Sequence, residues 1–284
     1  MTASYDRARQ DLGNVVLLEH VNVCIPDQRL ATVFYLSGLG LTRDPYLMTG
    51  IDNMWVNVGR SQFHLPSRGT QVLRGHVGIV MPDLAALKAR LQKVAPLLAE
   101  TRFAWSERDG MVEATCPWGN RYRCHAPAPE FGDTELAIAY VELGVPRDAA
   151  RGIVRFYQGV LGAHAVLEGE TAIVSVSATQ RLRFRETARP LPDYDGHHIQ
   201  VYVSDFSGPH RRLLERGLVT EESSEHQYRF CDIVDPESGK ALFTLEHEVR
   251  SLTHPLYARP LVNRNPTQNN RDYVRGHDAF RGSY

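Results

Sequence analysis

The sequence is poor in cysteine and contains no long apolar run. Its 284 residues include four cysteines, none of them in a C-x-x-C pair, so we expect reduced and mostly buried thiols. No apolar segment approaches the roughly 20 residues that cross a bilayer, and we therefore expect no membrane partner. The N-terminal stretch MTASYDRARQDLGN is polar and lacks the apolar core of a signal peptide, which favours a cytoplasmic location.

An excess of basic charge is also missing. The net charge is −1 and both signs are mixed along the chain, which argues against a dedicated nucleic-acid surface. The sequence has no GxSxG elbow, no P-loop and no dinucleotide-binding glycine pattern. What it does contain is 43% apolar and 23% charged residues, which is typical of a globular protein with one large domain or two ordinary ones.

Segments of the sequence recur at a constant spacing. The stretch FYLSGLGL begins at Phe34 and returns as FYQGVLGA at Phe156, 122 positions later. The stretch GHVGIVMPDL returns as HHIQVYVSDF, with His76 matching His198 at the same spacing. A spacing that recurs in separate motifs indicates a tandem duplication.

Each copy divides again into two units. LEHVNVCIPD and GHVGIVMPDL both alternate as strands and end in Pro-Asp, whose aspartate can cap the helix that follows. DLAALKARLQKV has apolar residues at helical spacing, whereas NMWVNVG, SQFHLP and RLRFRE alternate with period two. The sequence therefore predicts an α+β fold of four βαβββ units, which begin near His20, His76, Tyr140 and His198.

The fourfold pattern, with FYxxxLG closing the first helix, resembles the vicinal oxygen chelate superfamily, and the resemblance spans roughly residues 15–248. This superfamily includes glyoxalase I, type I extradiol dioxygenases and bleomycin-resistance proteins. The resemblance implies that the units pair into two open curved-sheet barrels. We expect a first domain over 15–128 and a second over 134–250. The prolines and asparagines that follow predict an extended tail over 251–284.

In this superfamily the metal ligands come from the first and last strands of the units. The first-strand positions carried over to this sequence are His20, His76, Tyr140 and His198. The last-strand positions are His64, Arg123, Arg185 and a residue in ALFTLEHE. There the family's glutamate falls near Phe243 or Thr244, and Glu246 is the nearest glutamate. We take Glu246 as the predicted ligand, although it is out of register.

Two pairings of the units are open. Pairing neighbouring units gives one nitrogen-rich site with an arginine in a ligand position and leaves too few ligands for the other. Pairing the first unit with the last gives a site of His20, His64, His198 and Glu246. We favour this second pairing because three imidazoles and a carboxylate suit Fe(II), or else Mn(II), Zn(II) or Ni(II).

Under the favoured pairing, the second and third units share the other barrel. It would hold His76, Arg123, Tyr140 and Arg185, which we predict to contact substrate or another anionic group. Its two guanidiniums would repel a metal ion. Arg181, Arg183 and Arg185 alternate along one strand face, either as a solvated edge or as a cluster that holds a carboxylate.

Two further residues are candidates for acid–base catalysis. His226 and Tyr228, in SEHQYRF, precede the last strand of the fourth unit, where extradiol enzymes of the superfamily carry a histidine that moves protons. An imidazole titrates near neutral pH, as such a role requires. The alternative is a hydrogen-bonded strand histidine without a catalytic role.

These residues lead to two hypotheses for function. The first is a metal-dependent enzyme that chelates adjacent oxygens of a small catechol, hydroquinone or enediolate-like molecule, either as an extradiol-like dioxygenase or as a glyoxalase-type isomerase or lyase. The second is a metal-free binding protein of the resistance type, with Trp55, Trp118 and Tyr202 lining an aromatic pocket. We expect a homo-oligomer.

Overall fold

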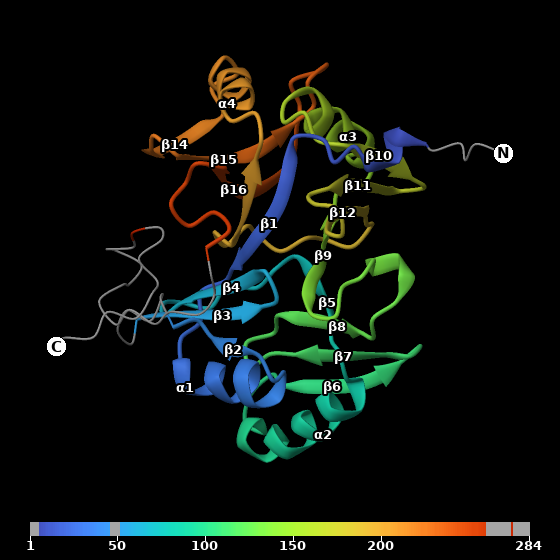
Figure 1. Ribbon diagram of the computed structural model, residues 1–284, viewed down its shortest axis with the longest axis vertical. Helices are drawn as coiled ribbons and strands as arrows, with labels where there is room; N and C mark the ends of the chain where they lie inside the picture. Colours follow the sequence, from blue (N-terminus) through green and yellow to red (C-terminus); the bar gives the residue numbers. More distant parts are fainter. Residues whose placement is uncertain (1–5, 46–51, 260–273, 275–284) are drawn as a thin grey trace.

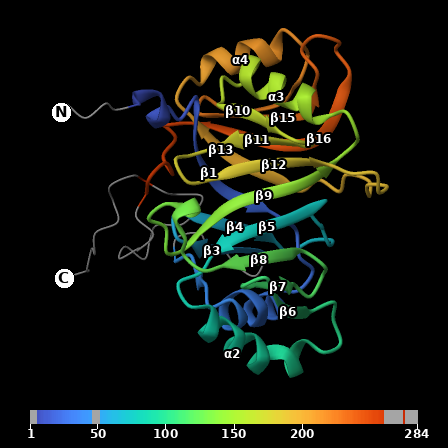
Figure 2. The same cartoon turned by 90° about the vertical axis from the view of Figure 1, so that its right-hand side faces the viewer.

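The computed structural model describes residues 6–45, 52–259 and 274 of the chain (Figures 1 and 2). Within them lie four units, each a strand, a helix and three further strands, as the sequence predicts. A short helix, η1 (Arg7–Gln10), precedes the first unit. No helix of the described residues is long and apolar enough to cross a membrane.

The units follow one another along the chain. The first comprises β1 (Val15–Asn22), α1 (Gln28–Ala31), η2 (Thr32–Gly38), β2 (Thr42–Arg43), β3 (Asn53–Val58) and β4 (Ser61–Pro66). The second comprises β5 (Gly75–Val80), α2 (Leu84–Val94), η3 (Ala95–Leu98), β6 (Ala104–Arg108), β7 (Met111–Thr115) and β8 (Arg121–His125). After η4 (Pro129–Phe131), the third comprises β9 (Ala137–Val145), α3 (Ala150–Gly159), β10 (Ala165–Glu168), β11 (Thr171–Ser175) and β12 (Arg181–Glu186). The fourth comprises β13 (His198–Val203), α4 (Ser207–Leu214), β14 (Val219–Ser224), β15 (Gln227–Val234) and β16 (Ala241–Ser251).

The helices of the first two units begin where the Pro-Asp motifs predict. The carboxylate of Asp27 accepts hydrogen bonds from the backbone N–H groups of Arg29 and Leu30 at 2.6 and 3.3 Å. The carboxylate of Asp83 accepts one from the N–H of Ala86 at 2.8 Å. These bonds satisfy backbone donors that the first turn of a helix leaves unpaired.

The units pair first with last. One sheet has the strand order β14-β15-β16-β13-β1-β4-β3-β2 and joins the fourth unit to the first. The other has the order β10-β11-β12-β9-β5-β8-β7-β6 and joins the third to the second. Within each unit the first strand runs parallel to the last, and the two central first strands of each sheet are antiparallel. The favoured pairing is therefore confirmed, and neither sheet is closed.

The helices connect units that the sheets keep apart. The repeated Phe-Tyr pair places Tyr35 of η2 against the last strand of the second unit, where its hydroxyl lies 2.5 Å from that of Tyr122. Tyr157 of α3 likewise reaches the last strand of the fourth unit, 2.6 Å from Nε2 of His247. Figures 1 and 2 show α3 and α4 together at one end of the molecule and α2 at the other. The repeat motif thus packs neighbouring units together, while the sheets join the two halves of the chain.

A buried glutamine fastens the two sheets to each other. The side chain of Gln180 accepts a hydrogen bond from the N–H of Leu18 on β1 and donates to the carbonyl of Ile138 on β9. A buried amide that satisfies both of its ends fixes the position of the strands it joins. It holds β1, which carries the first candidate ligand, against β9.

Part of the predicted tail packs on the first sheet. The ring of Tyr257 lies 4.9 Å from that of Tyr202, and the guanidinium of Arg259 pairs with Asp44 at 2.8 Å. Both members of this ion pair are buried. Residues 260–273 and 275–284 of the predicted tail lie outside the described residues.

Candidate functional site

Three histidines converge on the first sheet. His20 lies on β1, His64 on β4 and His198 on β13, and each offers one ring nitrogen within 4.8 Å of the other two. The register explains this, because Asn22 of β1 pairs with His64 on one side and with His198 on the other. The structure thus brings together three of the four predicted ligands.

The three imidazoles lie on the face of the sheet that points away from the helices. Phe63, beside His64 on β4, contacts the ring of Tyr35 in η2 at 5.5 Å. Because successive side chains of a strand point to opposite faces, His64 points the other way. The ring of Trp55 stacks on His64 at 3.8 Å and meets the edge of His20 at 5.0 Å.

Each histidine has one ring nitrogen held by a neighbouring side chain. Nδ1 of His20 lies 3.3 Å from the carboxylate of Glu19, and Nδ1 of His198 lies 3.3 Å from that of Glu246. Nε2 of His64 lies 2.7 Å from the amide oxygen of Asn53. Metal-binding histidines are oriented in this way, with one nitrogen fixed by an oxygen and the other left for the metal.

The remaining nitrogens fit a metal ion. Nε2 of His20 and Nε2 of His198 are buried and have no hydrogen-bond partner among the described residues. Burial, together with the positive charge that His20 would carry, holds the pKa of His64 and of His198 well below the usual range. Both imidazoles are therefore neutral at pH 7, the form in which imidazole binds a metal.

The register places a glutamate other than the predicted Glu246 at the position equivalent to His64. In the first unit His64 pairs with Asn22, which is two residues beyond His20. In the fourth unit the residue two beyond His198 is Gln200, and it pairs with Glu248. Glu248 is thus the equivalent of His64, and its carboxylate lies 3.7 Å from Nε2 of His198. The predicted ligand Glu246 pairs with His198 itself and faces its Nδ1.

Buried and half-buried charges of alternating sign surround the histidines. Arg250 pairs with Glu19 at 3.0 Å and with Glu248 at 2.6 Å. Arg229 of β15 forms ion pairs with both Glu248 and Glu246. Burial raises the pKa of Glu19, but the hydrogen bond with His20 and the charge of Arg250 outweigh it and lower the pKa to about 2. The pKa of Glu248 is lowered too, because the charges of Arg250 and Arg229 outweigh its burial, so Glu19 and Glu248 are held ionised beside the imidazoles.

Other polar groups on the same face lack partners. The amide of Gln200 is fully buried, and neither its nitrogen nor its oxygen has a hydrogen-bond partner among the described residues. The same holds for the amide oxygen of Asn22 and for the indole nitrogen of Trp55. Buried polar groups without partners are costly, and such groups mark a place where a ligand supplies the missing bonds.

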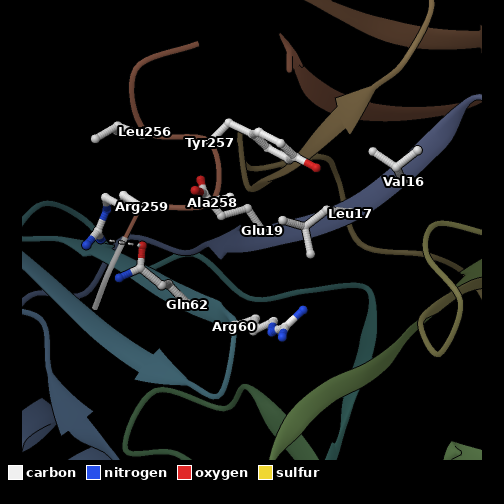
Figure 3. A pocket seen from close by; sticks show the side chains of 9 residues that line it. All are labelled: Val16, Leu17, Glu19, Arg60, Gln62, Leu256, Tyr257, Ala258 and Arg259. Atoms are coloured by element: carbon white, nitrogen blue, oxygen red, sulfur yellow. Dashed lines mark hydrogen bonds between the residues drawn. The ribbon is translucent and has the colours of Figure 1, made fainter. Parts of the chain in front are cut away.

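A cavity of about 420 Å³ adjoins this face, between β1, β4 and the segment 256–259 (Figure 3). Glu19 and Gln62 line it from the sheet, and Leu256, Tyr257 and Arg259 line it from the tail. Glu19 holds Nδ1 of His20, so the cavity borders the residue that orients His20 and not its free nitrogen.

The predicted acid–base residues lie elsewhere. His226 sits in the turn between β14 and β15, where its ring contacts Glu225 at 3.3 Å and Thr253 at 3.2 Å. Tyr228 is buried on the helix side of the sheet, against the rings of Phe206 and His210 of the fourth unit. The structure does not bring either residue together with the three histidines, and their catalytic role stays a prediction.

The four predicted substrate-binding residues all lie on the second sheet. Tyr140 packs edge-on against His76, with ring centroids 5.7 Å apart. Arg123 pairs with Glu113 at 2.9 Å, and Arg185 pairs with Glu142 at 3.1 Å. They belong to the other barrel and are separate from the histidine cluster.

Sequence reasoning missed Glu19, Glu248, Arg229 and Arg250. Glu248 and Arg250 follow Glu246 at spacings of two, so strand alternation alone puts all three on one face. The spacing of these residues in the sequence therefore indicates that Glu248 and Arg250 share a face with Glu246. The pairing of Glu19 with Arg250 joins the first and last strands of the repeat and carries no local signal.

No protein-family model and no curated protein matches the sequence. Solved structures do match in fold. A putative dioxygenase from Bacillus subtilis is 17% identical with a TM-score of 0.55, over 84% of this chain and 86% of that one. Glyoxalase I from Zea mays is 13% identical with a TM-score of 0.58, over 87% of this chain and 95% of that one. The chain therefore shares the fold of these structures, with the fourfold βαβββ repeat that its resemblance to the vicinal oxygen chelate superfamily implies.

Proposed function

We propose that the protein is a metal-dependent enzyme whose centre lies on the first sheet, and that it cleaves the ring of a small catechol or hydroquinone with O₂. The observation that carries this proposal is the convergence of three imidazoles, two of which bury an unpartnered Nε2. The fold supports it only generally, because the scaffold of this superfamily serves several chemistries.

The proposed ligands are His20, His64, His198 and Glu248. Glu248 replaces Glu246 as the carboxylate because it has the register of His64 and approaches the free nitrogen of His198. Two histidines and one carboxylate are the usual donors for Fe(II) in oxygenases, and the set proposed for this site contains them together with a third imidazole. The same donors accept Mn(II), Zn(II) or Ni(II), which would favour glyoxalase-type isomerisation instead.

A bound ion would supply Lewis-acid stabilisation of adjacent substrate oxygens and, as Fe(II), electrons for O₂. The protein's own residues orient the ligands and recognise the substrate. Glu19 and Glu246 fix the tautomers of His20 and His198 by accepting from Nδ1. The free amide of Gln200 and the indole N–H of Trp55 offer hydrogen bonds to an oxygen-rich substrate.

The charge of the site favours a substrate anion. Three carboxylates and two guanidiniums surround the histidines, namely Glu19, Glu246, Glu248, Arg229 and Arg250. Apart from the exposed Glu221, which also pairs with Arg229 at 3.6 Å, they leave one negative charge, which a divalent cation would turn into one positive charge. A catechol or hydroquinone that loses one proton on binding neutralises it, as buried charges require.

Metal analysis of untagged protein purified without oxygen and with iron supplied tests this function. We expect one iron per chain and O₂ consumption with members of a catechol and hydroquinone panel. Stoichiometric zinc or nickel together with isomerase activity would show that the protein catalyses the glyoxalase-type reaction and not the dioxygenase reaction. Protein that takes up no metal but binds aromatic ligands would show that it is a binding protein and not an enzyme of this kind.

A further inference from the structure

The second sheet repeats the geometry of the first with the opposite charge. His76 and Gly78 of β5 take the register of His20 and Asn22, since Gly78 pairs with Arg123 on one side and with Tyr140 on the other. Tyr140 therefore corresponds to His198 and Arg123 to His64. Glu142 lies two residues beyond Tyr140, and in the strand register it is the backbone neighbour of Arg183. Arg183 therefore corresponds to Glu248. Where the first sheet offers metal ligands, the second offers two guanidiniums.

Ion pairs neutralise only some of the arginines on this face. Arg123 and Arg185 each have an acidic partner, Glu113 and Glu142. Arg183 forms no ion pair with a described carboxylate; its guanidinium lies over the ring of Tyr140, 4.0 Å from the centroid.

The register gives the reason for this imbalance. Across the sheet from Glu248 stands Arg229, its ion-pair partner, whereas across from Arg183 stands Ile173. Arg121 adds a further cation, which donates to the carbonyl of Gly75 at 3.2 Å. Arg121, Arg181 and Arg183 thus form no ion pair among the described residues, although Arg121 and Arg181 donate to backbone carbonyls.

Buried polar atoms of this face are also unpartnered. His76 is 7% exposed, and its Nε2 has no hydrogen-bond partner among the described residues, nor has the buried Nε of Arg183. Burial and the nearby arginines, led by Arg123, lower the pKa of His76 to about 3. In the tautomer that carries its proton on Nε2, the neutral imidazole of His76 can donate a hydrogen bond to an anion.

Two hollows lie over the strands that flank β9, and Tyr140 itself lines neither of them. One of about 80 Å³ is lined by His76, Arg121, Arg123 and the paired Glu113. The other, of about 490 Å³, is lined by Arg183 and Arg185 together with Glu168, Glu170 and Glu186. Tyr140 itself approaches so closely that a Cβ at Gly78 would collide with its ring. The imidazole of His76 and the guanidinium of Arg183 therefore both contact this one aromatic ring, with a hollow on the strands to each side.

We propose that the second barrel is an oxyanion-binding site, in which Arg183 and Arg123 hold a small carboxylate or phosphate group beside His76 and Tyr140. Planar guanidiniums bind both kinds of group through paired N–H donors. The site is independent of the metal centre, because it is built from the second and third units only.

Calorimetric titration of the full-length protein with inorganic phosphate and with benzoate, at low ionic strength, tests the site. We expect saturable binding of one anion per chain, and an Arg183→Gln variant that binds it about 10-fold or more weakly. The tighter of the two probes tells a phosphate-bearing ligand from a carboxylate. No saturable binding of either probe would overturn the proposal.

Arg181→Gln is the matched control. The substitution lies on the same strand and removes the same charge, but the guanidinium of Arg181 donates to the carbonyls of Ser177 and Gln180. We expect the Arg181→Gln variant to bind the anion within about twofold of the wild-type affinity. Equal weakening in both variants would reduce the site to general electrostatics and overturn it. Arg183→Lys, which keeps the charge without the planar fork, replaces the glutamine variant if that one does not fold, and we expect it too to bind more weakly than wild type.

The metal centre provides the second control. We expect Arg183→Gln to keep its full metal content and a His20→Ala, His198→Ala double variant to keep anion binding. If the double variant loses the anion and Arg183→Gln does not, the anion binds at the metal centre instead. The two proposals can therefore fail separately.

Discussion

The two sheets carry the same register with different chemistry. At four corresponding positions the first sheet has His20, His64, His198 and Glu248, and the second has His76, Arg123, Tyr140 and Arg183. Only the first position keeps its residue type. The first set can donate lone pairs to a cation, and the second can donate hydrogen bonds to an anion.

The neighbours of these residues differ in the same sense. Trp55 stands across from His64 and stacks on it, whereas Glu113 stands across from Arg123 and neutralises it. The backbone of a duplicated unit therefore fixes where side chains meet, and the side chains decide what the meeting point binds. His76 takes the register of His20, but its neighbours are cations, so we expect it to bind no metal ion.

Removal of two first-sheet histidines is expected to have the largest effect. A His20→Ala, His198→Ala variant loses two imidazoles that nothing else on the sheet replaces. We expect metal affinity to fall by more than about 100-fold, since loss of an outer-shell partner alone costs 10- to 100-fold. Metal content after anaerobic reconstitution measures this.

His76→Ala is the control at the corresponding position of the second sheet. We expect it to retain its metal, because His76 shares its face with arginines and lies on the other sheet. Loss of metal from His76→Ala but not from the double variant would assign the metal to the second barrel and reverse the comparison.

The two glutamates of β16 separate a ligand from an orienting residue. We expect Glu248→Gln to lose metal affinity by more than about 100-fold and Glu246→Gln by about 10- to 100-fold, since Glu246 acts through Nδ1 of His198. Because Glu248 also pairs with Arg250, which keeps Glu19 as a partner, its variant should lower the free energy of unfolding by about 2 kcal/mol. Competition with a chromophoric chelator and urea unfolding measure both. Equal metal affinities in the two variants would contradict the register argument.

The features that sequence predicts here are those that repeat. The Phe-Tyr motif, the Pro-Asp caps and strand alternation predict four units. The pairing of first with last is predicted by the ligand positions that the family resemblance implies, weighed by the chemistry of the residues found there. Tyr35 and Tyr157 recur because each must fill the same space between a helix and a neighbouring unit's last strand.

The carboxylate could not be placed by counting along the sequence. β16 runs from Ala241 to Ser251, and its ladder with β15 shifts register twice, near Asp232 and Val234. Each shift moves the strand relative to the turn from which the family's glutamate position is counted. The pairing of β16 with β13 places Glu248 at the position equivalent to His64. This strand pairing is a tertiary contact, which the sequence does not reveal locally.

A pH measurement sharpens the contrast between the sheets. Above pH 6.5 His76 is neutral in both the folded and the unfolded chain. Below it the unfolded chain binds a proton that the folded protein excludes down to about pH 3, so stability falls over that window. We expect His76→Gln to remove about 2 kcal/mol of this loss at pH 4. Urea unfolding at pH 7 and pH 4 measures it, and parallel losses in variant and wild type would contradict it.

The smallest expected effect concerns Trp55, which distinguishes substrate recognition from metal binding. Trp55→Phe keeps an aromatic ring against His64 but removes an indole N–H that has no partner among the described residues. We expect unchanged metal content and a KM raised about 3- to 10-fold, the worth of one hydrogen bond. A variant that loses metal would show that the ring positions His64. A variant with unchanged KM would show that the N–H does not meet the substrate, and would leave Gln200 as the recognising group.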